Sequence, residues 1–593
     1  MFLPTTRSEM KDLGWDELDV ILVTGDSYID SPFIGTAVIG KVLRQAGYRV
    51  GVIAQPDIKT DADIARLGEP RLFWGVTGGS IDSMVANYTS LKKKRRSDDY
   101  TPGGQNTRRP DRAALIYTNL IRRFFKGTRP IVLGGLEASL RRVPHYDYWS
   151  DRVRSSILFD AKADYLLYGM AEKTALEVSE ALSRGTDPRH IRGLCYIAGE
   201  SDIAELKADY LELPPFETVE NDKQAFIEMF RTFYKNNDPL TARGLYQKQG
   251  TRYLVHNPPA LPLTQAELDS IYAIDYERAQ HPYYEKLGKV GALETIKFSI
   301  QTHRGCYGEC NFCAIAVHEG RTVQWRSQES ILAEARRLTA YPDFTGYIRD
   351  VGGPTANMYG FECKDKLQRG TCPDKRCLSP RVCASLKADH QHQLELLRKL
   401  RRIEGVKKVF VASGIRYDML LSDKLHGEAY LKEVIGHHVS GQMKIAPEHT
   451  EEGVLRKMGK PGTAALLEFK ALFDKLTKRA DKEQFLTYYL IAAHPGCTAT
   501  DMKRLKQFIS HNLKMNPEQV QIFLPAPSTW SAVMYYTGLD PFTGKPVFVE
   551  RDLRNKEIQK DIVVDKGVGR RTSKVSSDNV KPVVRQNFSK RTP

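Results

Sequence analysis

Three cysteines stand close together near the middle of this 593-residue sequence. They are Cys306, Cys310 and Cys313, in the segment RGCYGECNFCAIAVHEGR, with three and then two residues between them. Thiolates at such short spacing can bind one face of an iron–sulfur cluster, because successive turns of a loop aim several sulfurs at one site. Three ligands leave one iron of a four-iron cluster open, as a three-ligand zinc site leaves its metal open to substrate. Phe312 adds an apolar face beside the last cysteine.

Two other interpretations of these cysteines stay open at this point. They can be three buried structural thiols, or they can bind zinc. Structural zinc sites take four ligands, so three cysteines fit zinc poorly. The spacing therefore favours an iron–sulfur cluster with a vacant ligand position.

Four further cysteines follow within one segment rich in proline and lysine: Cys363, Cys372, Cys377 and Cys383. They are separated by eight, four and five residues, which matches neither of the usual zinc patterns. A zinc site, an auxiliary cluster and free thiols all remain open for them. The segment directly follows VGGPTANMYG, so we expect it to lie over the same site as the first three cysteines.

The composition is that of a globular protein with several domains. The chain is 41% hydrophobic and 27% charged, and a single core stops growing near about 300 residues. No run approaches the roughly 18 apolar residues of a membrane-spanning helix, and the N-terminus lacks the apolar core of a signal peptide. Clustered cysteines in such a chain indicate metal or catalysis rather than disulfides. We expect a cytoplasmic protein with no membrane partner.

Positive charge is concentrated in two places. The net charge is +16, and residues 551–593 hold 12 basic and 5 acidic residues. A second basic run, LKKKRRS, begins at Leu91. Both runs are compatible with an RNA partner and equally with a solvated loop and a solvated tail.

The elements that position the cysteines form two α/β regions. In residues 1–210, buried-strand runs such as LDVILVTG and PIVLGGLEAS alternate with amphipathic helical stretches, which predicts a doubly wound parallel sheet. Residues 211–285 are polar and tyrosine-rich, and we interpret them as a helical linker or insertion. Residues 286–545 contain six strand-like runs, each followed by a helical stretch, which suits a partial barrel with its chemistry at the carboxyl ends. Residues 546–593 are basic and lack periodicity, which predicts disorder.

The cysteine motif resembles the signature of the radical S-adenosylmethionine (SAM) superfamily. The segments VGGPTAN, VASGIRYD, KIAPEHTEEGVLRKMGKPG, AAHPGCT and FLPAPST follow in the order of that superfamily's later motifs. Across residues 10–550 the chain is similar to the YgiQ-type radical SAM proteins, through GGLEASLRRVPHYDYW and NMYGFECKD among others. The resemblance implies a cobalamin-binding-like N-terminal domain and a partial (β/α)6 TIM-like barrel.

The resemblance also implies cofactors and a reaction class. A 4Fe-4S cluster on the three cysteines would reductively cleave SAM, and the resulting radical would attack a substrate that the family does not reveal. An electron donor of the flavodoxin or ferredoxin type is expected. The residues in the places of SAM contacts are Phe312, Gly352, Gly353, Ser413, Gly414, Arg416 and Glu448. The chain departs from the pattern at Pro354 and Cys497, where acidic residues are usual.

A doubly wound domain before such a barrel resembles cobalamin-dependent members of the superfamily. Their DxHxxG fingerprint supplies a histidine to cobalt. Here Asp26 is present but Tyr28 stands in the histidine position, so the histidine ligand is missing. The pattern favours a degenerate domain that binds no cofactor or binds substrate, with bound cobalamin as the alternative. Two alternative functions follow: a cobalamin-dependent radical SAM methyltransferase, or an RNA-binding or tRNA-modifying protein that uses the basic segments.

Overall fold

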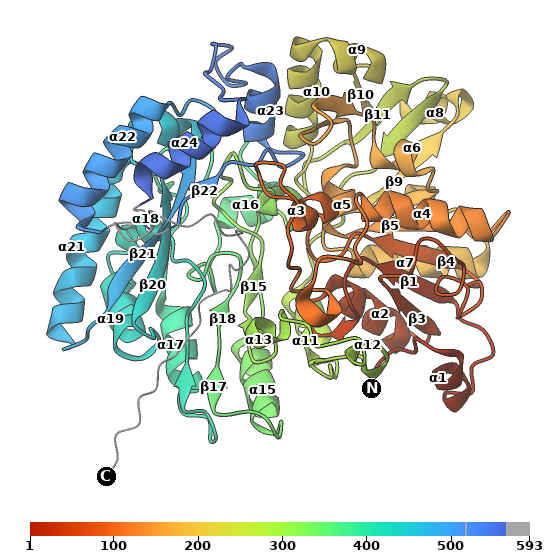
Figure 1. The fold of residues 1–593 in the computed structure, drawn as a ribbon, viewed down its shortest axis with the longest axis horizontal. Coiled ribbons are helices and arrows are strands. Elements are labelled where there is room, and N and C mark those ends of the chain that lie inside the picture. Colours follow the sequence, from red (N-terminus) through yellow and green to blue (C-terminus); the bar gives the residue numbers. More distant parts are fainter. Residues whose placement is uncertain (516, 518, 565–593) are drawn as a thin grey trace, which may run out of the picture.

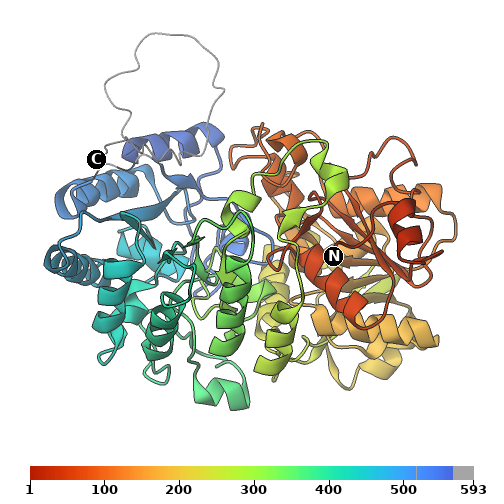
Figure 2. The ribbon, with the colours of Figure 1, turned by 90° about the horizontal axis from the view of Figure 1, so that it is seen from below.

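Two α/β halves lie side by side, as two views at right angles show (Figure 1, Figure 2). The computed structural model describes residues 1–564 except 516 and 518. The N-terminal half, red to yellow, is built on one nine-stranded sheet. The C-terminal half, green to blue, is an arc of parallel strands with helices outside it. No described helix combines the length and the apolar character needed to cross a membrane.

The core of the N-terminal sheet is parallel. Strand β1 (Val20–Thr24), the second from the sheet edge, is fully buried and pairs in parallel with β3 and β4. Valine and isoleucine dominate it because both faces are covered by helices. The sheet order is β10-β11-β12-β9-β8-β5-β4-β1-β3. The remaining strands are β3 (Val50–Ala54), β4 (Phe73–Thr77), β5 (Ile131–Gly134), β8 (Tyr165–Leu167), β9 (Leu194–Ala198), β10 (Tyr210–Leu213), β11 (Gly244–Gln249) and β12 (Arg252–His256).

The far side of this sheet differs from the expected domain division. Residues 211–285 contain helices, as the sequence suggests, but they also contribute β11 and β12 and nearly all of β10 to the N-terminal sheet. Strand β12 runs antiparallel to both β9 and β11, and β8 is antiparallel to β9. Strand β12 pairs with the nearby β11 in a hairpin. Its other neighbour, β9, lies about 55 residues earlier in the sequence. Hydrophobic periodicity describes each strand by itself and does not show which strands pair, so the sequence did not reveal that this region belongs to the sheet.

Helices cover both faces of the N-terminal sheet. Alternate residues of β1 enter two separate hydrophobic cores, with Ile21 and Val23 in one and Val20 and Leu22 in the other. On the Leu22 face the helices are α2 (Gly35–Gln45) and α7 (Glu172–Arg184), and on the other face they include α4 (Ala113–Phe124), α5 (Gly135–Leu140) and α10 (Lys223–Lys235).

The C-terminal half confirms the six predicted strand regions of a partial barrel. Parallel pairs join β14 to β18, β17 to β19, β20 to β21 and β21 to β22, and a parallel bridge from Ile415 to Ile445 links the β19 region to β20. The strands are β14 (Ile300–Gln301), β17 (Tyr347–Ile348), β18 (Val351–Gly352), β19 (Lys408–Val409), β20 (Gln442–Glu448), β21 (Phe485–Ala492) and β22 (Gln521–Ile522). The outer helices include α15 (Gln328–Thr339), α17 (Gln391–Leu400), α19 (Gly427–His437), α21 (Thr463–Arg479) and α22 (Ala499–Phe508).

The last described helices tie the two halves together. Helix α23 (Trp530–Thr537) packs against α10 in the N-terminal core. Helix α24 (Leu553–Val563) lies inside the tail for which the sequence predicts disorder, and it packs on α22 with Val563 fully buried. Residues 553–563 are therefore ordered, and the prediction of disorder was wrong for them. They bury one face of a helix, which the periodicity of the sequence did not reveal. The tail from 565 to 593 lies outside the described residues.

Candidate active site

The three clustered cysteines lie on a loop that follows β14 at the carboxyl end of the barrel. The loop is flanked by β15 (His303–Arg304) and β16 (Gln324–Trp325), which pair antiparallel and close its base. Helix α14 (Ile315–His318) follows the third cysteine. Gly305 has a φ of +83°, and a Cβ there would lie 2.4 Å from the Thr322 carbonyl oxygen, so only glycine fits this turn.

Two sulfurs of this loop, those of Cys306 and Cys310, lie beside Gly308. A Cβ on Gly308 would lie 3.2 Å from Cys306 Sγ and 3.6 Å from Cys310 Sγ, and the Gly308 N–H donates to Cys306 Sγ over 3.3 Å. Burial, with a smaller contribution from the neighbouring Cys310 sulfur, raises the pKa of the Cys306 and Cys313 thiols. Bound metal would reverse this shift, since metal ligation requires thiolates.

The three thiols do not form a compact group of the kind that holds a single ion. Among the described residues, only Asp389, Asp423 and His426 bring three such ligand atoms within 4.8 Å of one another. The three thiols are therefore spread more widely than the ligands of one zinc ion. A cluster that takes each cysteine on a different iron requires such spread.

Several segments distant in the sequence hold residues 305–313, which we call the cluster loop, in place. The Asn311 N–H donates to the Met458 carbonyl over 2.8 Å, and the Asn311 side chain donates to the Lys457 carbonyl over 2.8 Å. The Arg376 guanidinium donates to the Glu309 carbonyl over 3.0 Å and to Asn311 Oδ1 over 2.7 Å. The loop is thus fixed by α20 (Glu452–Met458) and by the segment that carries the second cysteine group.

Arg416 connects the cluster loop to the next predicted motif. Its Nη1 donates to Cys310 Sγ over 3.6 Å, and its Nε pairs with Asp418 over 2.6 Å. Its backbone N–H donates to Asn357 Oδ1 over 2.8 Å, and the Asn357 side chain donates to the Arg416 carbonyl over 3.2 Å. Hydrogen bonds therefore connect the turn at residues 351–357 to the turn at residues 413–416, directly beside Cys310.

The other residues predicted to contact SAM lie in the same two turns. Gly352 packs against Ser413, since a Cβ on Gly352 would lie 3.6 Å from Ser413 Cβ. The Gly352 carbonyl accepts the Thr302 N–H over 2.7 Å, and one lone pair of this oxygen stays available to a ligand. Ser413 is held by a hydrogen bond from its hydroxyl to Asp350.

The same pair of turns also reaches the first cluster cysteine. Gly353 lies against His303, whose Nε2 is 3.0 Å from the Thr355 carbonyl oxygen, and Cys306 Sγ is 3.7 Å from Thr355 Oγ1. The Gly414 carbonyl accepts the Ala356 N–H over 3.0 Å. The structure thus brings together residues 303–313, 352–357 and 413–416, which the sequence separates by up to about a hundred positions.

Phe312 and Glu448 share a cavity of about 300 Å³ inside the arc of strands. The rest of its lining comes from β21 and β22, including Tyr489 and Ile491. Glu448 ends β20 with a φ of +68° and is buried, and burial raises the pKa of its carboxyl group. Lys460 Nζ lies 3.7 Å from it. An apolar wall facing a buried carboxylate suits a ligand with a ring and a cationic or hydroxyl group.

The second cysteine group is only partly assembled. Cys363 and Cys377 join the small core around Tyr307, to which Cys306 and Cys383 also pack, whereas Cys372 is exposed. Burial raises the pKa of Cys377 to about 12, while hydrogen bonds from the Ser385 backbone and side chain lower the pKa of Cys383. As predicted, the segment lies beside the cluster loop. The four thiols are not gathered around one point.

Tyr28, which stands where related sequences have a cobalt-binding histidine, and the nearby Asp26 both make contacts inside the protein. Tyr28 is buried, its hydroxyl accepts the Leu3 N–H over 3.0 Å, and its ring stacks on His281 at 5.3 Å. Asp26 forms a buried ion pair with Arg109 over 2.8 Å. Neither side chain is free to reach a cofactor.

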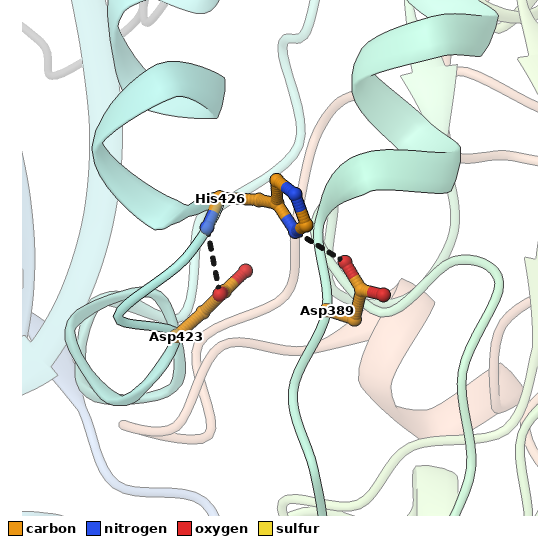
Figure 3. A group of neighbouring side chains, drawn as sticks. All are labelled: Asp389, Asp423 and His426. Carbon is orange, nitrogen blue, oxygen red and sulfur yellow. Dashed lines mark hydrogen bonds and ion pairs between the residues drawn. The ribbon is translucent and has the colours of Figure 1, made fainter.

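The group Asp389, Asp423 and His426 carries no metal site (Figure 3). Asp423 Oδ1 accepts the N–H groups of Leu425 and His426 at 3.1 and 2.9 Å. Asp423 Oδ2 accepts both the backbone and the ring N–H of His390 at 2.8 Å. With its lone pairs occupied, Asp423 acts as a cap for the turn before α19.

Sequence reasoning did not single out Asn357, Asp350 or Thr355 as site residues. Each lies in or next to the motif VGGPTAN, directly after a predicted strand. Their position could have identified them, because polar residues at the carboxyl ends of parallel strands face the active site in such barrels.

Comparison with known proteins shows which family the chain resembles. Residues 2–299 match the model described as "Radical SAM N-terminal", and residues 518–565 match a domain of unknown function, DUF3362. The chain is 56% identical over 571 residues to a UPF0313 protein of Fusobacterium nucleatum, covering 96% of this chain and all of that protein. It is 50% identical over 573 residues to a UPF0313 protein of Thermotoga neapolitana, with the same coverage. Among solved structures, it is similar to the radical SAM methyltransferase TsrM of Kitasatospora setae with cobalamin and a [4Fe-4S] cluster bound, at 14% identity and a TM-score of 0.47, over 85% of this chain and 71% of that one.

Proposed function

Because the chain belongs to the UPF0313 family and is a radical SAM enzyme, we propose that Cys306, Cys310 and Cys313 hold a 4Fe-4S cluster beside a SAM site in the partial barrel. When bound, the cluster supplies the electron for reductive cleavage of SAM, which drives radical chemistry on a substrate of unknown identity. The protein's own part is to bind, orient and shield these groups.

One observation carries this proposal: Arg416 contacts Cys310 Sγ at 3.6 Å and is joined by Asn357 to the glycine turn after β18. The three thiols and the residues predicted for SAM therefore form one connected site. That connection spans motifs more than a hundred residues apart in sequence. A set of unrelated structural thiols would not require it.

The roles of the surrounding residues follow from their contacts. The guanidinium of Arg416 offsets the negative charge of the thiolates and is itself oriented by Asp418. Phe312 provides an apolar wall that excludes water from the cavity it shares with Glu448. Glu448, with Lys460 nearby, supplies a polar end to that cavity and can accept a hydrogen bond from a ribose hydroxyl or an amino group.

The test is anaerobic cluster assembly followed by measurement of iron, sulfide and 5′-deoxyadenosine. We expect about four irons per chain and dithionite-dependent release of 5′-deoxyadenosine from SAM. Cys310→Ala should remove both, since two remaining cysteines cannot hold the cluster. A folded protein that takes up no iron and cleaves no SAM would disprove the proposal.

A matched control removes a cysteine elsewhere. Cys195 is buried in the N-terminal core and contacts none of the cluster cysteines in the described contacts. Cys195→Ala should retain iron and SAM cleavage at the level of the unaltered chain. Equal loss in both variants would show that the effect is a folding defect and not loss of a ligand.

We further propose a cytoplasmic location and an electron donor of the flavodoxin or ferredoxin type. All nine cysteines are free thiols, which fits a reducing compartment. The RNA alternative stays a prediction, because most of the basic tail lies outside the described residues. Deleting residues 565–593 and measuring salt-dependent RNA binding would test it.

A further inference from the structure

The barrel arc in the C-terminal half has one face that its helices leave uncovered. Strand β17 pairs with β19 and β20 pairs with β21, a bridge links the β19 region to β20, and the helices lie outside the arc (Figure 1). The strand residues packed in the core under these helices include Ile348, Val409, Ile445 and Leu486. Because side chains alternate along a strand, the positions between them point to the inside of the arc. We call these positions the inner face.

Several aromatic side chains on the inner face are exposed. The interior of a closed barrel is a packed core, but here Tyr347 is 39% exposed, Tyr489 42% and Phe485 55%. Tyr347 on β17 stacks on Phe410, directly after β19, with ring centroids 6.3 Å apart and an interplanar angle of 8°. Exposed apolar surface of this extent is typical of a binding surface.

Contacts on β20 and β21 connect the inner face to the cluster loop. The Thr487 hydroxyl donates to Gln442 Oε1 over 3.4 Å, which places these two side chains on the same side of the sheet. Further along β21, Tyr489 lines the cavity of about 300 Å³ that also contains Phe312 and Glu448. The exposed rings therefore lead to the site beside the cluster cysteines.

The charge of the inner face is positive. Arg349, directly after β17, and Lys444 on β20 are both exposed, and neither makes an ion pair or a side-chain hydrogen bond within the part of the chain that the structure describes. Glu448 is an acidic side chain at the carboxyl end of this face, and Lys460 Nζ lies 3.7 Å from it. The two exposed cations are therefore available to an anionic ligand.

Rings and unpaired cations together define the chemistry of that ligand. A hydrophobic peptide would use the rings but not the cations, and an acidic peptide would use the cations but not the rings. The basic C-terminal tail has a charge of the same sign as the cations, so it is a poor occupant. A single strand of nucleic acid offers bases that stack on aromatic side chains and phosphates that contact Lys and Arg. RNA-binding sheets use exposed aromatic residues in the same way.

From this we propose that the inner face binds a single-stranded segment of nucleic acid, which makes nucleic acid the substrate class of the site beside the cluster. As a statement about substrate this inference rests on the proposed function, whereas the binding itself does not require the cluster. Bases stack on the rings of β21 and on the Tyr347–Phe410 pair, and Arg349 and Lys444 contact phosphates between them. Neighbouring strands lie about 4.8 Å apart, so the face from β17 to β21 is about 14 Å wide and takes only a few nucleotides.

The test measures fluorescence anisotropy of a labelled single-stranded RNA of about 12 nucleotides, a length within the range of known single-strand sites. The full-length protein is titrated before and after cluster assembly, at a series of salt concentrations. We expect saturable binding in both preparations that weakens as salt rises. A duplex of the same sequence and poly-glutamate should bind at least about tenfold more weakly, because neither offers free bases. Absence of RNA binding, or equal binding of either competitor, would overturn the proposal.

Two inner-face variants locate the binding surface. Phe485→Ala removes an exposed ring and should weaken RNA binding about fivefold or more, which is the loss expected for one stacked base. Arg349→Gln/Lys444→Gln should reduce the slope of log affinity against log salt by about 1.4, because each phosphate contact to a single strand contributes about 0.7.

Matched controls lie on the outer helix α21. Leu467→Ala removes an exposed apolar side chain there, and Lys475→Gln/Lys478→Gln removes two exposed cations. Neither should change the affinity or the salt slope. Inner-face variants that keep the normal affinity, slope and melting temperature would show that RNA binds elsewhere and would overturn the proposal, as would equal losses in the controls.

Release of 5′-deoxyadenosine from SAM, measured in the same preparations, separates this inference from the proposed function. A chain that binds RNA through the inner face but cleaves no SAM would disprove the proposed function and leave a nucleic-acid-binding face. A chain that cleaves SAM but binds no single-stranded RNA would disprove only the inference made here about the inner face.

Discussion

Arg416 Nη1 lies 3.6 Å from Cys310 Sγ while the other side of the same guanidinium pairs with Asp418. A buried cation is thus fixed against one of three half-buried thiols. Arg416 ends the turn after β19, and Asp418 lies in the first turn of helix α18 (Tyr417–Ser422). The cluster cysteines and the barrel are therefore coupled electrostatically as well as by packing.

Replacing Arg416 should shift the reduction potential of the assembled cluster. A nearby positive charge favours the more negative, reduced form, so its removal in Arg416→Met should lower the potential by on the order of 60 mV, a tenfold change for one electron. Because Asp418 would be left buried and unpaired, the double variant Arg416→Met/Asp418→Asn is the better one to measure. Potentiometric titration followed by EPR checks the shift. An unchanged potential with a full complement of iron would mean that Arg416 does not face the cluster.

Gly308 should be required for cluster assembly. Its Cβ would lie 3.2 Å from Cys306 Sγ, 3.4 Å from Arg416 Nη1 and 3.6 Å from Cys310 Sγ. Gly308→Val would occupy the space on which these groups converge and should reduce bound iron severalfold. Iron content and melting temperature check this. Gly134→Ala, where a Cβ meets nothing, is the control.

The sequence revealed the local features of this site and missed those that depend on pairing between distant segments. The spacing of Cys306, Cys310 and Cys313 and the six strand regions of the barrel are local patterns, and the structure shows the strands as predicted. That β12 joins β9 is a pairing between segments far apart, and no periodicity within either segment indicates it. For the same reason the hydrogen bond from the Thr302 N–H to the Gly352 carbonyl could not be predicted from the sequence. Helix α24 was missed because its buried face carries two polar residues, Lys556 and Gln559, beside Val563, so no apolar periodicity marks it.

The ion pair between Glu172 and Arg304 should contribute to the stability of the contact between the two halves. Both side chains are buried, and Arg304 lies two residues before Cys306. Glu172→Gln leaves the guanidinium with a hydrogen bond to the Tyr272 hydroxyl but no counter-charge. We expect a loss of about 3 kcal/mol or more in the free energy of unfolding, measured by chemical denaturation.

A double variant separates charge from packing at this contact. Glu172→Gln/Arg304→Met removes both charges and should cost less than Glu172→Gln alone, because no buried charge is left unpaired. A double variant that loses as much as the sum of the two single variants would show that the two side chains act independently.

Acid should destabilise the protein between about pH 6.5 and pH 4. Burial is the largest cause that lowers the pKa of several histidines to about 4; they include His303, His438 and His449. In the unfolded chain such residues titrate near about 6.5, so in this window the unfolded state binds more protons than the folded state. Stability therefore rises with pH through the window and is lost as the pH falls, by up to about 1.4 kcal/mol per pH unit for each histidine.

His438 is the residue with which to test this, since it lies away from the cluster cysteines. It is fully buried, and its Nδ1 lies 2.8 Å from the Val409 carbonyl oxygen, to which it donates as the neutral tautomer. His438→Asn can keep that hydrogen bond but cannot take up a proton, so its stability at pH 7 should be lower while its slope between pH 6.5 and pH 4 becomes shallower. Denaturation at a series of pH values measures both quantities. His511 is exposed and shows no such burial, and His511→Asn should leave the slope unchanged. Identical slopes in the unaltered chain and in His438→Asn would show that His438 protonates in the folded state without penalty.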